Sequence, residues 1–205
     1  MIQDKNIDLV DTHKILGVYF SCHLSWDTHV NYVARKISSV TGVMSRCRTV
    51  LPQEVKLQLY NALFAPHMSY CSLVWASTTR ANIEKIIVLQ KRYLRYLANI
   101  DHHSTTRHLF AKYKIISFDY HYEHRLLHAF YFSQHDSQSF LRSMALLQPR
   151  ATPSLTRISE PWLVPYFRTQ YKLQSLKHNM PVLLNQHKQV AFKSPKELRV
   201  HFSQL

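Results

Sequence analysis

The apolar residues of this chain recur mainly at helical spacing. From Val30 onward they follow steps of three and four residues, which places them on one face of a helix: Val30, Val33, Ile37, Val40, Met44 and Cys47. A second face of this kind, with one glutamine among its members, comprises Ile83, Ile86, Ile87, Gln90, Leu94 and Leu97. Both patterns predict amphipathic helices with one buried face, the second spanning residues 81–98.

The stretch between these two helices is predicted to be helical but interrupted. Its inner face is expected to consist of Val55, Leu59, Ala62 and Leu63. Pro66 cannot donate a hydrogen bond to the carbonyl four residues earlier, so we expect a kink or a break there. Residues 57–79 carry no charged side chain, but polar residues interrupt the run, and buried core helices are therefore favoured over a membrane span.

Shorter elements are predicted on either side of these helices. Residues 14–20 are rich in β-branched and aromatic side chains, which indicates a short β segment with a bend or close backbone approach at Gly17. Later in the chain, helices are expected from Ser104 through Lys112, over 119–134 and over 195–204.

The last of these helices has a clear start signal. Ser194 can cap it, Pro195 suits its first turn, and Glu197 can complete a capping box. Residues 154–190, by contrast, contain three prolines and are expected to be irregular.

Together these elements predict a mainly α fold, in which a short β segment precedes a helical bundle and a less regular C-terminal region of helices and irregular chain follows. We expect four parts, over residues 1–24, 25–100, 101–148 and 149–205, with a polar, proline-bearing loop over 148–153. The chain has only two glycines. This scarcity disfavours an all-β fold with many tight turns and excludes a glycine-rich phosphate loop.

The composition is strongly basic, with 26 Lys and Arg against 12 Asp and Glu and a net charge of +14 with neutral histidines. Such a chain favours polyanions, either nucleic acid or an anionic membrane face, although a basic protein without such a partner is the simpler alternative. Aromatic residues interleave with the charges, as stacking on bases requires. We therefore favour nucleic acid.

Positive side chains gather on helix faces away from the apolar ones. They form two candidate nucleic-acid-binding strips, Lys91, Arg92 and Arg95 on the second helix and Arg35, Lys36, Arg46 and Arg48 on the first. Such strips suit a phosphate backbone, but an ordinary solvated helix face has the same pattern. Tyr96 is the best candidate for stacking on a base or sugar.

The acidic residues form no catalytic pattern. Polymerase chemistry needs closely placed carboxylates that hold two metal ions, whereas the acidic residues here are dispersed and no Asp-Asp pair occurs. We therefore expect no catalytic residue and no cofactor. One alternative is a helical metalloprotein in which His121, His124 and His128 converge on Zn²⁺. The simpler interpretation of these histidines is polar surface.

Cysteine usage and the N-terminal segment bear on the compartment. Cys22, Cys47 and Cys71 are an odd and widely spaced set, so they are expected to be reduced thiols and not a disulfide framework. Residues 1–11 are too polar and acidic for a signal peptide. We expect a protein of the nucleus or cytoplasm that is not secreted and has no membrane partner.

Several short motifs occur in the order and spacing of one known family. They are Lys14-Ile15-Leu16-Gly17-Val18, Leu24-Ser25-Trp26, Leu59-Tyr60, Pro66, Tyr70-Cys71, Val74-Trp75, Leu89-Gln90-Lys91-Arg92, Val164-Pro165, Arg168-Thr169-Gln170-Tyr171, Asn185 and Phe192-Lys193. Together they resemble the thumb and C-terminal region of reverse transcriptases from non-LTR (LINE-type) retrotransposons, especially the Jockey- and RTE-like groups. Lys172 stands where that family usually has glycine, and Leu184 where it has tryptophan.

The resemblance implies that the four parts are the end of the palm, the helical thumb, a post-thumb region and the tail. Leu16 and Gly17 then correspond to the primer grip. Fingers and the palm with its catalytic aspartates are not represented. The resemblance therefore implies a fragment of an RNA-directed DNA polymerase that binds template–primer, as an RNA or DNA duplex or single strand, and is catalytically incompetent alone.

Two alternatives to this function remain open. The chain could be a non-enzymatic protein-interaction module, or a decayed transposon remnant without a selected function. A thumb without its palm and fingers also exposes the apolar surface that normally meets them. Self-association is therefore expected, most strongly through the face built by residues 14–33.

Overall fold

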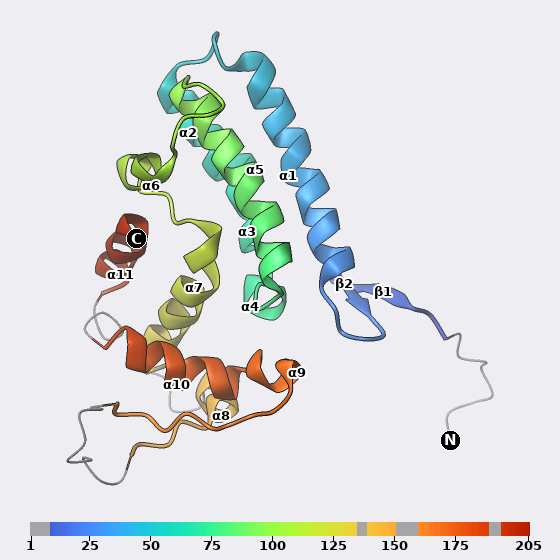
Figure 1. The fold of residues 1–205 in the computed structure, drawn as a ribbon, viewed down its shortest axis with the longest axis vertical. Helices are drawn as coiled ribbons and strands as arrows, with labels where there is room; N and C mark the ends of the chain where they lie inside the picture. The colour runs from blue at the N-terminus through green and yellow to red at the C-terminus, as the bar shows by residue number, and fades with distance from the viewer. Residues whose placement is uncertain (1–8, 135–138, 151–159, 189–193) are drawn as a thin grey trace. The chain divides into compact units, whose positions relative to one another are not determined.

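The computed structural model describes residues 9–134, 139–150, 160–188 and 194–205. These residues form helices and one two-stranded sheet that precedes them, so the predicted mainly α fold is confirmed (Figure 1). The chain divides into two compact units, Met1–Asn99 and Ile100–Leu205. The finer division into four parts stays a prediction.

The first unit begins with a β-hairpin in place of the single bent segment expected over 14–20. Strands β1 (Thr12–Ile15) and β2 (Val18–Ser21) pair in antiparallel fashion. The two turn residues, Leu16 and Gly17, have φ values of 47° and 86°. A two-residue hairpin turn of this kind needs positive φ at both positions, which glycine adopts freely and leucine rarely does.

Helices α1 (Asp27–Cys47) and α5 (Arg80–Ala98) lie side by side and run in the same direction (Figure 1). Near their starts, the Asn82 amide donates to the Asp27 carboxylate at 2.7 Å. Near their ends, Arg48 lies over the Tyr96 ring. Parallel neighbours need a returning segment between them, and residues 53–75 supply it.

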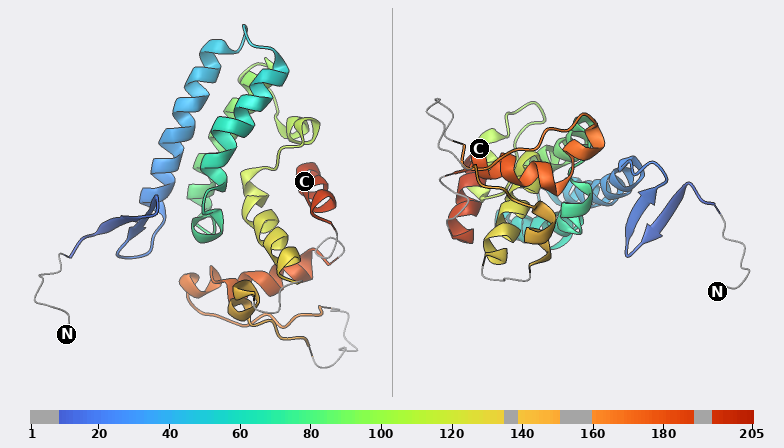
Figure 2. Two further views of the ribbon diagram at one scale, coloured as in Figure 1. Left: turned by 180° about the vertical axis from the view of Figure 1, so that it is seen from behind. Right: turned by 90° about the horizontal axis from the view of Figure 1, so that it is seen from below.

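The returning segment consists of four consecutive helical elements. They are α2 (Gln53–Leu59), the π-helical turn η1 (Tyr60–Phe64), α3 (Ala65–Ser69) and α4 (Ser72–Trp75). The view from behind in Figure 2 shows this segment packed against the α1–α5 pair. The first unit is thus a helical bundle preceded by a hairpin.

The apolar faces predicted for the two long helices are confirmed. On α1 the buried residues include Val30, Val33, Ile37 and Met44, and on α5 they include Ile86, Ile87, Leu94 and Leu97. Gln90 is buried on the same face, and its side-chain amide donates a hydrogen bond to the Tyr60 hydroxyl at 2.8 Å. A buried amide is tolerated when it is hydrogen-bonded in this way.

The inner face predicted for the returning segment is wrong. Val55 and Leu63 are 36% and 48% exposed, and the buried face is one residue further along, at Lys56, Tyr60, Phe64 and Met68. These positions follow steps of four. The apolar pattern did not reveal them because their first member is a lysine, which is rarely fully buried.

Lys56 is only 1% exposed, and its ammonium lies at the C-terminal end of α5. It donates to the Asn99 side-chain oxygen at 2.9 Å and to the Tyr96 carbonyl at 3.4 Å. A cation is favoured at this end of a helix because the last carbonyls lack intrahelical partners. Burial, together with the nearby charge of Arg48, lowers the pKa of Lys56.

The irregularity expected near Pro66 takes the form of the π turn directly before it. The Ala65 amide donates to the Tyr60 carbonyl, five residues earlier, where an α-helix would use the carbonyl four residues earlier. This widened turn lets the helix pass the proline, which has no amide hydrogen of its own.

The second unit contains α6 (Arg107–Tyr113), α7 (Phe118–Ser133), α8 (Phe140–Ala145), α9 (Gln170–Leu173), α10 (Leu176–Gln186) and α11 (Pro195–Gln204). The helices predicted over 119–134 and 195–204 are therefore confirmed, and the Ser194 hydroxyl accepts from the Glu197 amide as expected. The helix predicted from Ser104 begins three residues later, at Arg107.

The core of the second unit is formed largely by α7, α10 and α11. Its buried members include Leu126, Leu127, Phe130, Met180, Leu183, Leu184, Leu198 and Phe202. The prediction that 154–190 is irregular is therefore wrong for α10, which continues through Pro181. An internal proline costs a helix about 3 kcal/mol, and the burial of the α10 side chains offsets that cost.

The tail motif around Asn185 has a structural role. The side chain of Asn185 accepts from the Trp162 amide at 3.1 Å and donates to the Trp162 carbonyl at 2.9 Å. In the loop expected over 148–153, Pro149 forms a β-bridge with Trp162, whereas residues 151–153 lie outside the described residues, as do Phe192 and Lys193. None of the helices in the described part of the chain has the length and apolar character needed to span a membrane.

Candidate nucleic-acid interface

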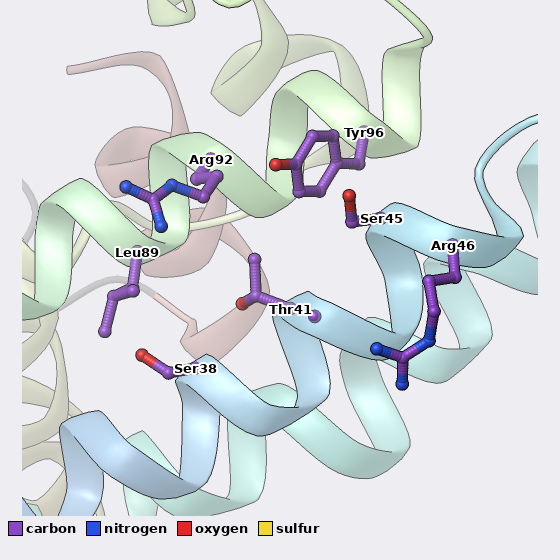
Figure 3. Close-up of a pocket in the computed structure, with 8 residues that line it drawn as sticks. Ser38, Thr41, Ser45, Arg46, Leu89, Arg92 and Tyr96 are labelled. Carbon is purple, nitrogen blue, oxygen red and sulfur yellow. The ribbon is translucent and has the colours of Figure 1, made fainter.

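A groove with a volume of about 330 Å³ runs between α1 and α5 in the first unit (Figure 3). Its lining residues are Ser38, Thr41, Gly42, Ser45 and Arg46 from α1, and Leu89, Arg92 and Tyr96 from α5. Helix α1 therefore contributes mainly small and hydroxyl side chains together with Arg46, and α5 contributes a basic, an apolar and an aromatic side chain.

The groove exists because α1 carries small residues where it faces α5. Gly42 is the extreme case, since a Cβ atom added there would meet no heavy atom within 4 Å. The Thr41 hydroxyl donates to the Ile37 carbonyl at 2.7 Å, so it can still accept a hydrogen bond but no longer donate one.

The groove is electropositive. Arg46 and Arg92 line it, and none of its lining residues is acidic. Among the described residues, no carboxylate forms an ion pair with either guanidinium, whereas Glu84 on the same helix α5 is paired with Arg80 at 3.1 Å. Two guanidinium groups without acidic partners are suited to bind phosphate oxygens.

Tyr96 lines the groove as well, next to a third arginine. The guanidinium of Arg48 lies 5.8 Å from the centre of the Tyr96 ring, within the range of a cation–π interaction. The ring is partly buried, and it gives the groove an aromatic wall.

The structure thus brings together part of the predicted strips. Arg46 and Arg92 line the groove, and Arg48 adjoins it through Tyr96. The other four candidates do not line it: Lys91, Arg35 and Lys36 are exposed, and Arg95 is partly buried. Lys36 lies near the middle of α1, and its ammonium is 5.6 Å from the centre of the Tyr32 ring.

The hydroxyl residues of the groove were missed at the level of sequence. Ser38, Thr41 and Ser45 are spaced three and four residues apart, which is the same helical periodicity that identified the apolar face. Charge and aromatic character do not point to these residues, whereas this second periodic pattern on the same helix is the signal that does.

The two residues matched to the primer grip lie in the hairpin turn. The side chain of Leu16 is 85% exposed, and its carbonyl accepts a hydrogen bond from the Tyr70 hydroxyl at 2.6 Å. A Cβ atom added at Gly17 would lie 3.4 Å from the Tyr70 ring. Tyr70 therefore ties the turn to the returning helical segment.

The simpler interpretation of the α7 histidines, as polar surface, is wrong for His121 and His124. His121 is buried and stacks on Phe118, with 5.5 Å between ring centres, and His124 packs edge-on against Phe202. Burial, the largest cause, lowers the pKa of His121 to about 3 and that of His124 to about 4. Partly exposed His128 lies next to His124, with 5.9 Å between ring centres.

These histidines do not form a metal site in the structure. Within the described residues, no group of three or more histidine, cysteine, aspartate or glutamate side chains is placed to hold a metal ion. The Nε2 atoms of His121 and His124 are buried and have no hydrogen-bond partner there. The structure therefore gives no support to the metalloprotein alternative.

Comparisons of the chain with protein-family models, curated proteins and solved structures found no match.

Proposed function

We propose that this chain is a fragment of a LINE-type retrotransposon reverse transcriptase, the thumb with its C-terminal region, and that it binds nucleic acid without polymerising. The ordered motifs from Lys14 to Asn185 support the family. The observation that supports binding most strongly is one groove that is lined by Arg46 from α1 and Arg92 from α5 and has no acidic residue in its lining.

The binding surface that we propose is the side of α1 and α5 that carries the basic residues. Arg46 and Arg92 contact phosphates from the groove, and Arg48 holds Tyr96 at its wall. Lys91 and Arg95 extend the surface along α5, and Arg35 and Lys36 extend it along α1. Such contacts position a duplex or a single strand without reading its sequence. Binding of this kind suits a protein of the nucleus or cytoplasm.

Charge reversal tests the proposal. Replacing Lys91, Arg92 and Arg95 together by glutamate should reduce affinity for a 20-base-pair RNA–DNA hybrid by about 100-fold or more, because attraction to two or three phosphates becomes repulsion. Fluorescence anisotropy measures the affinity, and circular dichroism checks that helicity is retained.

The matched control changes the net charge by the same amount elsewhere. Replacing Arg107, Lys112 and Lys196 by glutamate alters three exposed residues of the second unit. This control should lose much less affinity than the α5 variant. Equal losses in both variants would mean that net charge, and not the α1–α5 surface, governs binding.

A protein-interaction module is the second candidate, and the apolar exposure of the hairpin region favours it. Ile15, Leu16 and Leu24 are all exposed in the first unit, whereas Val30 and Val33 in the same segment are buried. Sedimentation over a range of concentrations tests it: self-association that is abolished by Leu16→Ser, without any nucleic-acid binding, would favour this candidate.

A further inference from the structure

We propose that the α1–α5 groove is a nucleotide-sized site, which holds one internal phosphate of a nucleic-acid strand together with the adjoining sugar and base. This inference rests on the proposed function, because it names the part of the ligand that one site takes. It differs from binding along charged helix faces, which needs no groove and no particular group of the strand.

The polar residues of the groove match a phosphodiester. Arg92 lines the groove from α5 and Arg46 lines it from α1, with their guanidinium groups pointing in different directions (Figure 3). The planar fork of donors on the Arg92 guanidinium fits two phosphate oxygens. The hydroxyls of Ser38 and Ser45 lie on the same side of the groove, one turn of α1 on either side of Thr41. A phosphate between the helices would thus meet donors from both walls.

The remaining residues match the neighbouring nucleoside and not a second anion. Leu89 and Tyr96 give the α5 wall an apolar and an aromatic surface (Figure 3). Aromatic rings bind bases and sugars by stacking, whatever the sequence. A volume of about 330 Å³ is at the lower end of the range for small-molecule sites, so a nucleotide is a better fit than a larger group.

Gly42 allows the groove to be closed without changing any charge. Because open space surrounds the position of its missing Cβ, the variant Gly42→Leu should fill the groove without a clash. It should also favour helix α1, since leucine has a higher helix propensity than glycine. Val43→Leu is the control, because Val43 is a neighbouring exposed residue that does not line the groove.

The experiment measures binding of a fluorescent oligonucleotide to the full chain. Gly42→Leu should weaken affinity by about 10-fold and should make the slope of log K against log [salt] shallower by about 0.9, the loss of one phosphate contact. Val43→Leu should change affinity by less than about twofold, as surface substitutions usually do. Inorganic polyphosphate is the comparison ligand, because it has phosphates but no nucleoside. The Gly42→Leu variant should bind it only about threefold more weakly than the wild-type chain does.

Each other outcome contradicts the inference in a distinguishable way. If Gly42→Leu binds as wild type while the α5 charge reversal abolishes binding, the proposed function stands and the groove is not a site. If polyphosphate loses as much affinity as the oligonucleotide, the groove takes phosphate alone. If the wild-type chain binds no oligonucleotide, the proposed function fails and the groove site fails with it.

Discussion

At the scale of single residues, the least expected feature is a buried lysine at the end of α5. Lys56 has no carboxylate partner among the described contacts and is held by the Asn99 side chain and the Tyr96 carbonyl. The same residue links the helices, because its own carbonyl accepts from the Tyr93 hydroxyl at 2.9 Å. It thereby fixes the end of α5 close to Arg48 and the groove.

The Asn99→Gly variant tests this role of Lys56. Asn99 has a φ of 54°, which glycine adopts without strain, so the variant removes the amide oxygen and leaves the backbone intact. It should lower the free energy of unfolding by about 1.5–3 kcal/mol, because a hydrogen bond to a buried charge is lost.

The Lys56→Met background supplies the control for this prediction. There the ammonium is already absent, so Asn99→Gly should cost well under about 1 kcal/mol. Urea denaturation of all four proteins gives the coupling. Equal costs in both backgrounds would show that the lysine and the asparagine act independently.

At the scale of elements, the α7 histidines predict how the second unit responds to acid. Their pKa in the unfolded chain is near the ordinary value of 6.5, and in the folded unit burial lowers it to about 3 for His121 and about 4 for His124. Below pH 6.5 the unfolded chain therefore binds protons that the folded unit does not. Its stability should fall as the pH drops from about 6.5 toward 4.

Hydrogen exchange of the α7 amides, corrected for intrinsic rates, measures this loss. The double variant His121→Phe, His124→Phe should flatten the pH dependence of protection, since both titrating groups are removed. The exposed His108 provides the control, and His108→Phe should leave the dependence unchanged. Protection that is constant from pH 7 to pH 4 in the wild type would contradict the prediction.

The elements also show how far sequence reasoning reaches. Periodicity predicted α1 and α5 because their buried faces are mostly apolar, and the cap signals at Ser194, Pro195 and Glu197 predicted α11. The inner face predicted for α2 is wrong because its buried position is Lys56, and the irregular chain predicted around Pro181 is the helix α10. In both cases tertiary packing outweighs a local preference. The hairpin was missed because Leu16 adopts a positive φ that its type does not suggest.

The candidate site was predictable only in part, because tertiary packing decides which side chains meet. Arg46, Arg92 and Tyr96 could be chosen from charge and aromatic character, but their meeting at one groove depends on α1 and α5 running parallel. That arrangement follows from the returning segment, which the sequence predicts as interrupted helix but whose buried face, beginning at Lys56, the apolar pattern misplaces. The four strip residues outside the groove show that a charged residue on a helix face does not reveal which other residues will lie next to it in the fold.

At the scale of the whole molecule, the amount of positive charge and its placement have different consequences for binding. The chain carries +14, and any protein so charged attracts polyanions weakly. The proposed function requires more than this, namely a defined number of phosphates bound on the α1–α5 surface.

The dependence of binding on salt tests that central claim most directly. The affinity of the wild-type chain for an RNA–DNA hybrid should be measured by anisotropy between 50 and 300 mM potassium chloride, where about four phosphate contacts predict a log–log slope near −3.6. A slope close to that value, made shallower by the Lys91, Arg92 and Arg95 reversal, is the result that we expect. An affinity that does not change with salt, or no binding at the lowest salt concentration, would contradict the proposed function.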